Sequence, residues 1–168
     1  MNYRTWSYRF ADQVLNSNLK ARSEIEQIVR AVELPEGEYK RVDLNKAFQQ
    51  EFVNRGWKEQ SRLFENGDLE DGEDVPFSKL DFLKDRIGVE VAFSHASFIG
   101  IDLLKFQMMS YASLDKIDVG VYIVATNSLH KATGKAFDGS VTFEKVTRYL
   151  PHFKSAIQVP VLVIGLLP

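Results

Sequence analysis

The sequence predicts an α/β domain with a central mixed β-sheet and helices on both of its faces. Residues 87–93 alternate between apolar and small or polar side chains, as a strand with one face in the core does. Residues 98–111 are apolar over a helical length, and residues 117–124 form a continuous apolar run of strand length. A strand, a helix and a strand in this order form a β-α-β crossover, which is right-handed and parallel in nearly all cases.

The composition is that of an ordinary globular domain. Of 168 residues, 45% are hydrophobic and 26% charged, so we expect a single domain over residues 1–168 and exclude disordered, collagen and coiled-coil classes. The absence of cysteine excludes disulfides, thiol nucleophiles, zinc fingers and iron–sulfur clusters, and it fits a cytoplasmic protein. No run approaches the roughly 18 apolar residues of a membrane span, and the first ten residues contain no signal-peptide core. We therefore expect no membrane association.

The N-terminal part predicts an extended segment and a helix. Residues 3–10 are rich in aromatic side chains and predict a short extended segment that a helix follows. Over residues 19–32, apolar side chains recur at steps of three and four, which predicts an amphipathic helix that ends before Pro35 and Gly37. Its apolar positions are Leu19, Ile25, Ile28, Val29 and Val32.

A second helix has clear signals at both ends. Asp43 is a good N-cap, and Gly56 suits the C′ position, where a left-handed residue ends a helix. Trp57 then leads into a short predicted strand. The apolar face between the two ends consists of Leu44, Ala47, Phe48, Phe52 and Val53.

The remaining elements surround the crossover. Residues 80–84 predict a strand or hairpin arm next to the strand at 87–93. The helix over residues 98–111 is too apolar for a surface helix, so we expect it to be largely buried in the core, with part of it available for a dimer. Residues 142–152 predict a helix ahead of a last buried strand at residues 159–165.

The net charge of −2 hides an uneven distribution of charge. Residues 65–74 carry six carboxylates and no base, which is typical of a solvated loop, and their spacing is not that of a calcium-binding loop. The whole chain has a net charge of −2, and the residues outside this segment have a net charge of +4. Between residues 125 and 158, bases outnumber acids by five to two. The composition is therefore compatible with a nucleic-acid partner.

Two carboxylates interrupt the apolar pattern of neighbouring strands. Glu90 lies in the middle of the strand at residues 87–93, and Asp81 lies nine residues earlier in the other predicted strand. If the strands pair, the carboxylates approach each other, and such a pair becomes favourable when a divalent cation such as Mg²⁺ lies between them. Alternatively, Glu90 lies at a sheet edge or pairs with Lys84 or Arg86.

Several ordered blocks of the sequence resemble type II restriction endonucleases of the BglII and BstYI group, and BstYI most of all. They are LNKAFQQEFVNRGWKE from Leu44, DFLKDRIGVEVAF from Asp81, then SFIGIDLLKF and KIDVGVYIV, and finally VPVLVIGLLP. The resemblance implies a PD-(D/E)XK nuclease core and a Mg²⁺-dependent, site-specific deoxyribonuclease. It also implies that Asp81, Glu90 and the backbone carbonyl of Val91 hold the catalytic metal.

One position departs from this group. The residue two places after the metal-binding Glu is commonly Lys in the superfamily and Gln in BglII and BstYI, but here it is Ala92, which can neither orient a water molecule nor carry a proton. His95 is the first candidate for the missing catalytic role, because imidazole accepts a proton near neutral pH. It lies on the other strand face unless the strand ends by Ser94. Lys84 and Glu51 are further candidates.

The polar segment at residues 125–140 predicts a DNA-reading segment, with an ordinary surface loop as the alternative. It follows a strand end and is rich in short hydrogen-bonding side chains and bases, which suit base edges and phosphates. In the BglII and BstYI group the matching loop contributes to recognition, as does the position of His95, a Lys in BstYI. The candidate DNA-binding residues are Lys84, His95, Asn127, Lys131, Lys135, Asp138 and Ser140.

The resemblance also implies the partners. Double-stranded DNA is the expected substrate, and a homodimer is expected because a two-fold protein reads a palindromic sequence. The relatives act on sites centred on GATC, and a cognate methyltransferase is expected in the genome. A DNA-binding protein of this fold with impaired catalysis is the alternative that Ala92 raises, and a nicking or repair nuclease is a third possibility.

Overall fold

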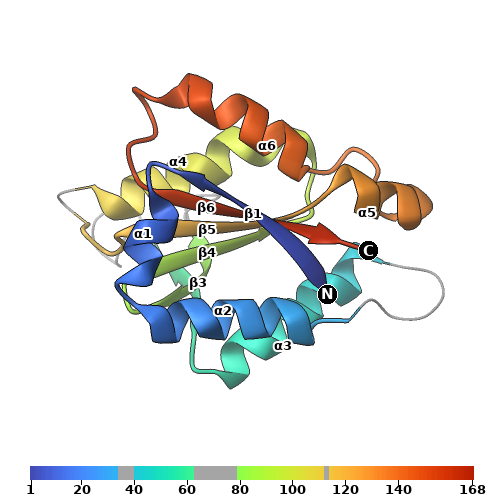
Figure 1. The fold of residues 1–168 in the computed structure, drawn as a ribbon, viewed down its shortest axis with the longest axis horizontal. Helices are drawn as coiled ribbons and strands as arrows, with labels where there is room; N and C mark the ends of the chain where they lie inside the picture. Colours follow the sequence, from blue (N-terminus) through green and yellow to red (C-terminus); the bar gives the residue numbers. More distant parts are fainter. Residues whose placement is uncertain (34–39, 63–78, 112–113) are drawn as a thin grey trace, which may run out of the picture.

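The computed structural model describes residues 1–33, 40–62, 79–111 and 114–168. These residues form an α/β domain in which a six-stranded sheet, ordered β1-β6-β5-β4-β3-β2, lies between two layers of helices (Figure 1). The three central strands β4, β5 and β6 are parallel, and the outer strands are antiparallel to their neighbours. The predicted mixed sheet with helices on both faces is confirmed.

The described elements have the following bounds. The strands are β1 (Asn2–Tyr8), β2 (Lys58–Arg62), β3 (Lys79–Lys84), β4 (Ile87–Ala92), β5 (Val119–Ala125) and β6 (Val161–Leu167). The α-helices are α1 (Ala11–Asn16), α2 (Leu19–Ala31), α3 (Arg41–Asn54), α4 (Ile99–Ser110), α5 (Asn127–Ala132) and α6 (Phe143–Tyr149). The acidic run at residues 65–74, together with Pro35 and Gly37, lies outside the described residues.

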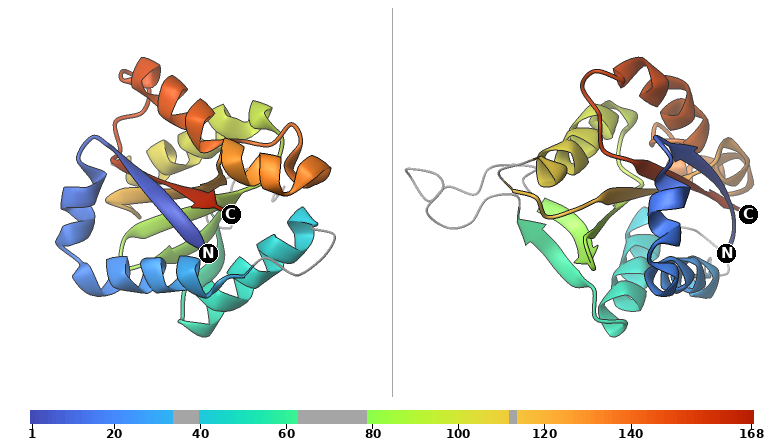
Figure 2. Two further views of the ribbon diagram at one scale, coloured as in Figure 1. Left: turned by 45° about the vertical axis from the view of Figure 1, so that its right-hand side comes forward. Right: turned by 60° about the vertical axis from the view of Figure 1, so that its left-hand side comes forward.

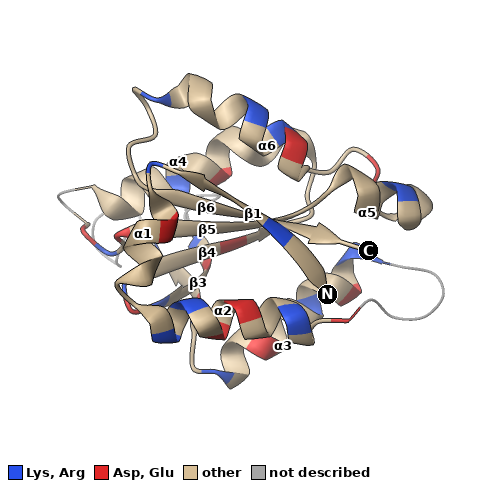
Figure 3. Ribbon diagram, in the orientation of Figure 1, with Lys and Arg blue, Asp and Glu red and all other residues tan. Residues whose placement is uncertain are grey.

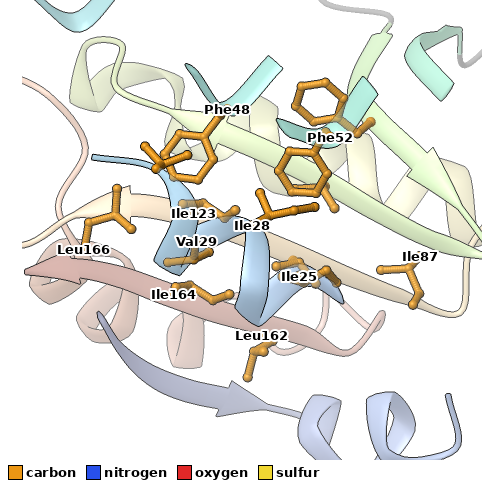
Figure 4. Packing of buried hydrophobic residues seen from close by; sticks show 14 of the residues in the cluster. Ile25, Ile28, Val29, Phe48, Phe52, Ile87, Ile123, Leu162, Ile164 and Leu166 are labelled. Carbon is orange, nitrogen blue, oxygen red and sulfur yellow. The ribbon is translucent and has the colours of Figure 1, made fainter. Parts of the chain in front are cut away.

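Each face of the sheet has its own helices and its own core. Helices α1, α2 and α3 pack on one face, and α4 and α6 pack on the other, as the two views in Figure 2 also show. On the first face, aromatic rings of α3 and aliphatic side chains of α2 meet the central strands (Figure 4). The residues in contact there include Ile25, Ile28, Val29, Phe48, Phe52, Ile123 and Ile164.

Strand β1 ends two residues before the predicted end of the extended segment. Arg9 and Phe10 adopt left-handed φ angles of 50° and 60°, so the chain turns away from the sheet and begins α1. Helix α1 is separate from α2, a break that the sequence prediction did not include. Asn18 caps α2, since its side chain accepts a hydrogen bond from the Ala21 N–H at 3.2 Å.

Helix α3 begins earlier than predicted but ends as predicted. Lys40 occupies the N-cap position and Asp43 lies in the first turn, so the prediction of Asp43 as N-cap is wrong. The Asp43 carboxylate still complements the positive end of the helix dipole. At the other end Gly56 has φ 76°, and the N–H groups of Gly56 and Trp57 donate to carbonyls of the last turn at 2.9 and 3.1 Å. This is the Schellman arrangement of a helix with glycine at C′.

Strands β3 and β4 form the predicted hairpin. Its two turn residues, Asp85 and Arg86, have φ angles of 48° and 62°, which correspond to the type I′ turn that matches the twist of a hairpin. Arg86 is held by carboxylates of Asp115 and Asp118 at 2.6 and 2.8 Å. Strand β4 is buried on both faces rather than on one, because it lies inside the sheet between the two helical layers.

Helix α4 forms the crossover from β4 to β5 and is only half buried. Its inner face contributes Leu103, Phe106 and Met109 to the core. Its outer face exposes three apolar residues at helical spacing, and Tyr111, directly after the helix end, is exposed beside them, so the expectation of a largely buried helix holds for one face only. This outer surface, which we name the α4 stripe, consists of Ile101, Leu104, Met108 and Tyr111.

The polar segment after β5 is folded rather than an open loop. Thr126 caps α5 by accepting from the Leu129 N–H at 3.1 Å, and a 3₁₀ turn, η2 (Gly134–Phe137), follows. Helix α6 continues into a 3₁₀ turn, η3 (Leu150–Phe153), which matches the helix predicted at residues 142–152. Among the helices that the structure describes, none combines the length and the apolar character needed to span a membrane.

Candidate active site

Asp81 and Glu90 lie where β3 and β4 separate. The ladder between the two strands runs from Lys84–Ile87 to Phe82–Val89, and the two carboxylates occupy the next position on each strand. Oδ2 of Asp81 accepts a hydrogen bond from the backbone N–H of Val91 at 2.8 Å. Backbone pairing between β3 and β4 ends before this position, and the Asp81 side chain provides the hydrogen bond between the two strands there.

The Val91 carbonyl faces the same gap. The N–H and C=O of one strand residue point toward the same neighbouring strand. Since the Val91 N–H donates to Asp81 on β3, the Val91 carbonyl oxygen also points to the β3 side. The structure therefore places the three predicted oxygen donors, two carboxylates and one backbone carbonyl, at adjacent positions where β3 and β4 separate.

Glu90 is buried and paired with a lysine. Its residue exposure is 4%, and it is the one charged residue of the three central strands. Figure 3 shows acidic colouring on strand β4. Nζ of Lys105 lies 3.2 Å from both Oε1 and Oε2. The sequence alternatives, a pair with Lys84 or Arg86, are wrong, because those two side chains pair with Glu24 and with Asp115 and Asp118.

Lys105 connects Glu90 to a second buried carboxylate. Its Nζ lies 3.5 Å from Oδ1 of Asp102, one turn earlier on α4. The hydroxyl of Tyr122, on β5 directly opposite Glu90, donates to Oδ2 of Asp102 at 2.7 Å. We name Asp81, Glu90 and Asp102 the acidic cluster.

Burial raises the pKa of each carboxyl group in the acidic cluster. For Glu90, burial and then repulsion from Asp81 raise the pKa well above its ordinary value. Burial also raises the pKa of Asp81, and the hydrogen bond from Val91 lowers it by less. In the same way, burial raises the pKa of Asp102, and the hydrogen bond from Tyr122 lowers it by less. Burial lowers the pKa of Lys105, but attraction to Glu90 and Asp102 outweighs it and the net shift is upward. A cation placed between Asp81 and Glu90 would relieve the repulsion that helps to raise the pKa of Glu90.

The donor set fits a hard divalent cation. Carboxylate and carbonyl oxygens are the ligands of Mg²⁺, which retains several waters and demands few protein ligands. Within the described part of the chain, no three Asp, Glu or His side chains converge on one metal position. An ion at this site would therefore rest on Asp81, Glu90 and the Val91 carbonyl, with waters or phosphate oxygens completing its coordination.

An open cleft leads to Asp81 from the α3 side of the sheet. It has a volume of about 300 Å³ and is lined by β2, β3 and α3 as well as by Val91. Helix α3 contributes Asn45, Lys46 and Gln49, which are side chains that can hydrogen-bond to or attract a phosphate. The cleft thus offers an approach to two of the residues that carry candidate metal ligands, Asp81 and Val91, along a polar wall.

The candidates for the missing role of Ala92 lie in different surroundings. His95 is exposed; its Nδ1 accepts from the Ser97 N–H at 3.3 Å, and in the described residues no hydrogen bond joins it to Asp81 or Glu90. Lys84 donates to Glu24 and to the Arg55 carbonyl at 2.7 and 2.6 Å. Glu51 forms an ion pair with Arg55.

The predicted DNA-reading residues form a mixed group. Asn127, Lys131 and Asp138 are exposed, whereas Ser140 is fully buried and its Oγ lies 2.9 Å from Nε2 of His130. The Lys135 backbone lies in η2, and its side chain is outside the described part of the structure. His95 forms an isolated antiparallel bridge with Ser140, so it adjoins the segment at residues 125–140.

Sequence reasoning missed Lys105, Asp102 and Arg41. Asp102 and Lys105 are charged residues three positions apart in an otherwise apolar helix, and this spacing places them on the same helix face. The sequence pattern could therefore have identified them as a buried pair. Arg41 donates to the carbonyls of Ala136 at 2.6 Å, Phe93 at 3.2 Å and Asp138, and so fastens the start of α3 to the segment after β5. No local pattern predicts that clamp.

Comparisons with known proteins agree with the fold. A family model described as restriction endonuclease BglII/BglIII matches residues 3–166. The fold is similar to the crystal structure of restriction endonuclease BglII complexed with a DNA 16-mer, with TM-score 0.78, 20% sequence identity, and coverage of 100% of this chain and 77% of that chain. It is also similar to free BglII, with TM-score 0.71, 20% identity, and coverage of 100% and 80%. No curated protein sequence matches the chain.

Proposed function

The chain belongs to the BglII/BglIII restriction endonuclease family, and from this premise we propose that it is a Mg²⁺-dependent type II restriction endonuclease. The proposed reaction is hydrolysis of phosphodiester bonds in double-stranded DNA at a short palindromic site, centred on GATC as in the relatives. The observation that supports the proposal is the position of Asp81, Glu90 and the Val91 carbonyl next to one another where β3 and β4 separate.

The residues of the site have distinct proposed roles. When bound, Mg²⁺ neutralises charge on the phosphate and lowers the pKa of a bound water. Asp81, Glu90 and the Val91 carbonyl hold the ion. The Val91 N–H fixes Asp81, so its carboxylate needs little reorganisation when the ion binds. The polar wall of α3 beside the cleft receives the DNA backbone.

DNA contacts are proposed for the segment after β5 and for His95. Asn127, Lys131 and Asp138 support this by their exposure, and Lys135 belongs to the same segment. Ser140 contributes by holding His130 and thereby the loop, rather than by facing solvent. His95, which adjoins this segment, is proposed to contact DNA, and its catalytic role stays a prediction. Lys84 also stays a predicted DNA contact, although it already holds Glu24.

The remaining proposals concern assembly and setting. We infer a homodimer, because each subunit can then cut one strand of a palindrome. The α4 stripe supports this as an apolar surface of the monomer. We also propose that BstYI is a near relative within the family, that a cognate methyltransferase accompanies the enzyme, and that the protein acts in the cytoplasm.

Cleavage of plasmid DNA tests the proposal. With Mg²⁺ the protein should produce discrete fragments, and with EDTA it should produce none. Asp81→Ala and Glu90→Ala should each lower the cleavage rate by about 100-fold or more, because each removes a metal ligand. Glu26→Ala is the matched control, since Glu26 pairs with Arg22 on α2 and should leave cleavage unchanged. Unchanged cutting in both site variants would show that these carboxylates are not the metal ligands.

Ala92 favours one alternative, a sequence-specific DNA-binding protein with impaired catalysis. This alternative predicts gel shifts on specific DNA without cleavage, and recovery of cleavage in Ala92→Gln. Nicked rather than linear plasmid would instead indicate a nicking enzyme of the same fold.

A further inference from the structure

Glu90 has a cationic partner in this structure. The position two residues later, which is commonly Lys in the superfamily, is Ala92 in this chain. The ammonium of Lys105 reaches both oxygens of the Glu90 carboxylate at 3.2 Å, from a different element of the fold. We propose that Lys105, from helix α4, positions Glu90 in the cleavage reaction and so provides the cationic neighbour that position 92 does not. This inference rests on the proposed function and names a positioning residue for it.

The fold delivers Lys105 to this place by close packing of α4 on the sheet. Phe106, the next residue, lies against Gly120 of β5, where a Cβ atom would come within 2.7 Å of the ring. Gly120 therefore permits the helix to lie near the strands. As a result Lys105 reaches β4, where its side chain is 11% exposed.

Two further groups hold the ammonium in place. Asp102 lies 3.5 Å from Nζ, and Tyr122 fixes Asp102 through the 2.7 Å hydrogen bond from its hydroxyl. Tyr122 is the β5 residue directly opposite Glu90. Glu90, Lys105 and Asp102 are thus connected through contacts from β4, α4 and β5, and a lysine with two buried partners is far less mobile than one in solvent.

Ala92 and Lys105 are complementary in space. Residues 90 and 92 project to the same face of β4, because side chains alternate along a strand. Ala92 is 4% exposed and packs in the same core as the inner face of α4. A long side chain at position 92 would therefore extend into the region that Lys105 occupies, whereas alanine leaves that region to Lys105. This relation predicts that the two positions can exchange roles.

Four variants test the exchange in the full-length protein with Mg²⁺ and cognate plasmid. Lys105→Met keeps the length of the side chain but removes the charge, and it should lower kcat by about 100-fold or more while KM for DNA changes little. The double variant Lys105→Ala with Ala92→Lys should recover at least about 10-fold of that loss, because its ammonium again lies near Glu90. Lys105→Arg should retain partial activity. Lys20→Met, at an exposed position of α2, should cut like the wild type.

The outcomes separate this inference from the proposed function. A wild-type protein that cuts no DNA contradicts the proposed function. A wild type that cuts, with Lys105→Met cutting equally fast, overturns the role of Lys105 and leaves the proposed function intact. A folded double variant that stays as slow as Lys105→Met, judged by circular dichroism, indicates a structural lysine and also overturns the role. If neither Lys105→Met nor the double variant folds, Lys105 is needed for the stability of the fold and the inference fails.

Discussion

Lys84 shows how one side chain can have a structural task at a position that the sequence assigns to DNA. Its ammonium lies 2.7 Å from Glu24 of α2 and 2.6 Å from the Arg55 carbonyl at the end of α3. Glu24 also accepts from Nε1 of Trp57 at 2.5 Å. Burial on its own raises the pKa of Glu24, but the hydrogen bonds from Lys84 and Trp57 outweigh it and lower the pKa.

This shift predicts a pH-dependent loss of stability in Glu24→Gln. A lowered pKa in the folded state stabilises the protein above the unfolded pKa, about 4.3, and this contribution disappears as pH falls through the folded pKa. Glu24→Gln should therefore lower the free energy of unfolding by about 1 kcal/mol at pH 7 and by much less near pH 3. Urea unfolding at both pH values measures the difference. An equal loss at both would show that the carboxylate charge is unimportant.

At the scale of elements, the ends of α3 and α4 place the site. The C-terminal turn of α3 depends on Gly56, whose φ of 76° suits a residue without Cβ. It directs Trp57 into the core and leads into β2 beside the cleft. Gly100 lies in α4 with ordinary helical geometry, so the two glycines form a natural comparison.

Substitution by alanine should therefore have opposite effects at the two glycines. A Cβ meets nothing within 4 Å at either position, so backbone conformation alone decides the outcome. Gly56→Ala should cost about 1–2 kcal/mol, because alanine is strained in the left-handed region. Gly100→Ala should stabilise the protein by up to about 1 kcal/mol through helix propensity. For a domain of this size each kcal/mol corresponds to about 2–4 °C in Tm, which thermal unfolding resolves. Equal shifts at both positions would contradict this assignment.

At the scale of the whole molecule, the α4 stripe is an apolar surface on a helix that also carries Lys105. Ile101, Leu104 and Met108 are 36%, 47% and 38% exposed, and Tyr111 is 65% exposed. The inner face of the same helix holds Lys105 against Glu90. A dimer formed through the stripe would therefore connect subunit assembly to the acidic cluster through one rigid helix.

The dimer proposal predicts dissociation by charge in the stripe. Leu104→Glu and Met108→Glu should each weaken the dimer by about 10- to 100-fold, since each removes about 1.5–3 kcal/mol of apolar burial. Analytical ultracentrifugation at micromolar concentration measures the change. Leu19→Glu is the matched control, because Leu19 is 67% exposed on α2 and should leave the mass unchanged. A wild type that sediments as a monomer would contradict the proposal.

Local patterns in the sequence predict the central strands, most of the buried faces of α2 and α3, the end of α3 and the two carboxylates of the hairpin. Leu19 of α2 and Val53 of α3, which were predicted on these faces, are exposed. These features follow from local periods of two and 3.6 residues, from glycine at a helix end and from polar residues in apolar runs. Asp81 and Glu90 were found because one turn joins their strands.

Packing between distant elements determines which cation contacts Glu90, which carbonyls Arg41 binds, which side of α4 is exposed and how the segment after β5 folds. Lys105 and Arg41 meet partners from other elements, and such contacts depend on how elements pack rather than on any local repeat. The two helical layers also decided that β4 is buried on both faces. The sequence pattern is enough to locate Asp81 and Glu90 on neighbouring strands. The packing of α4 on the sheet is what brings the Lys105 ammonium to Glu90.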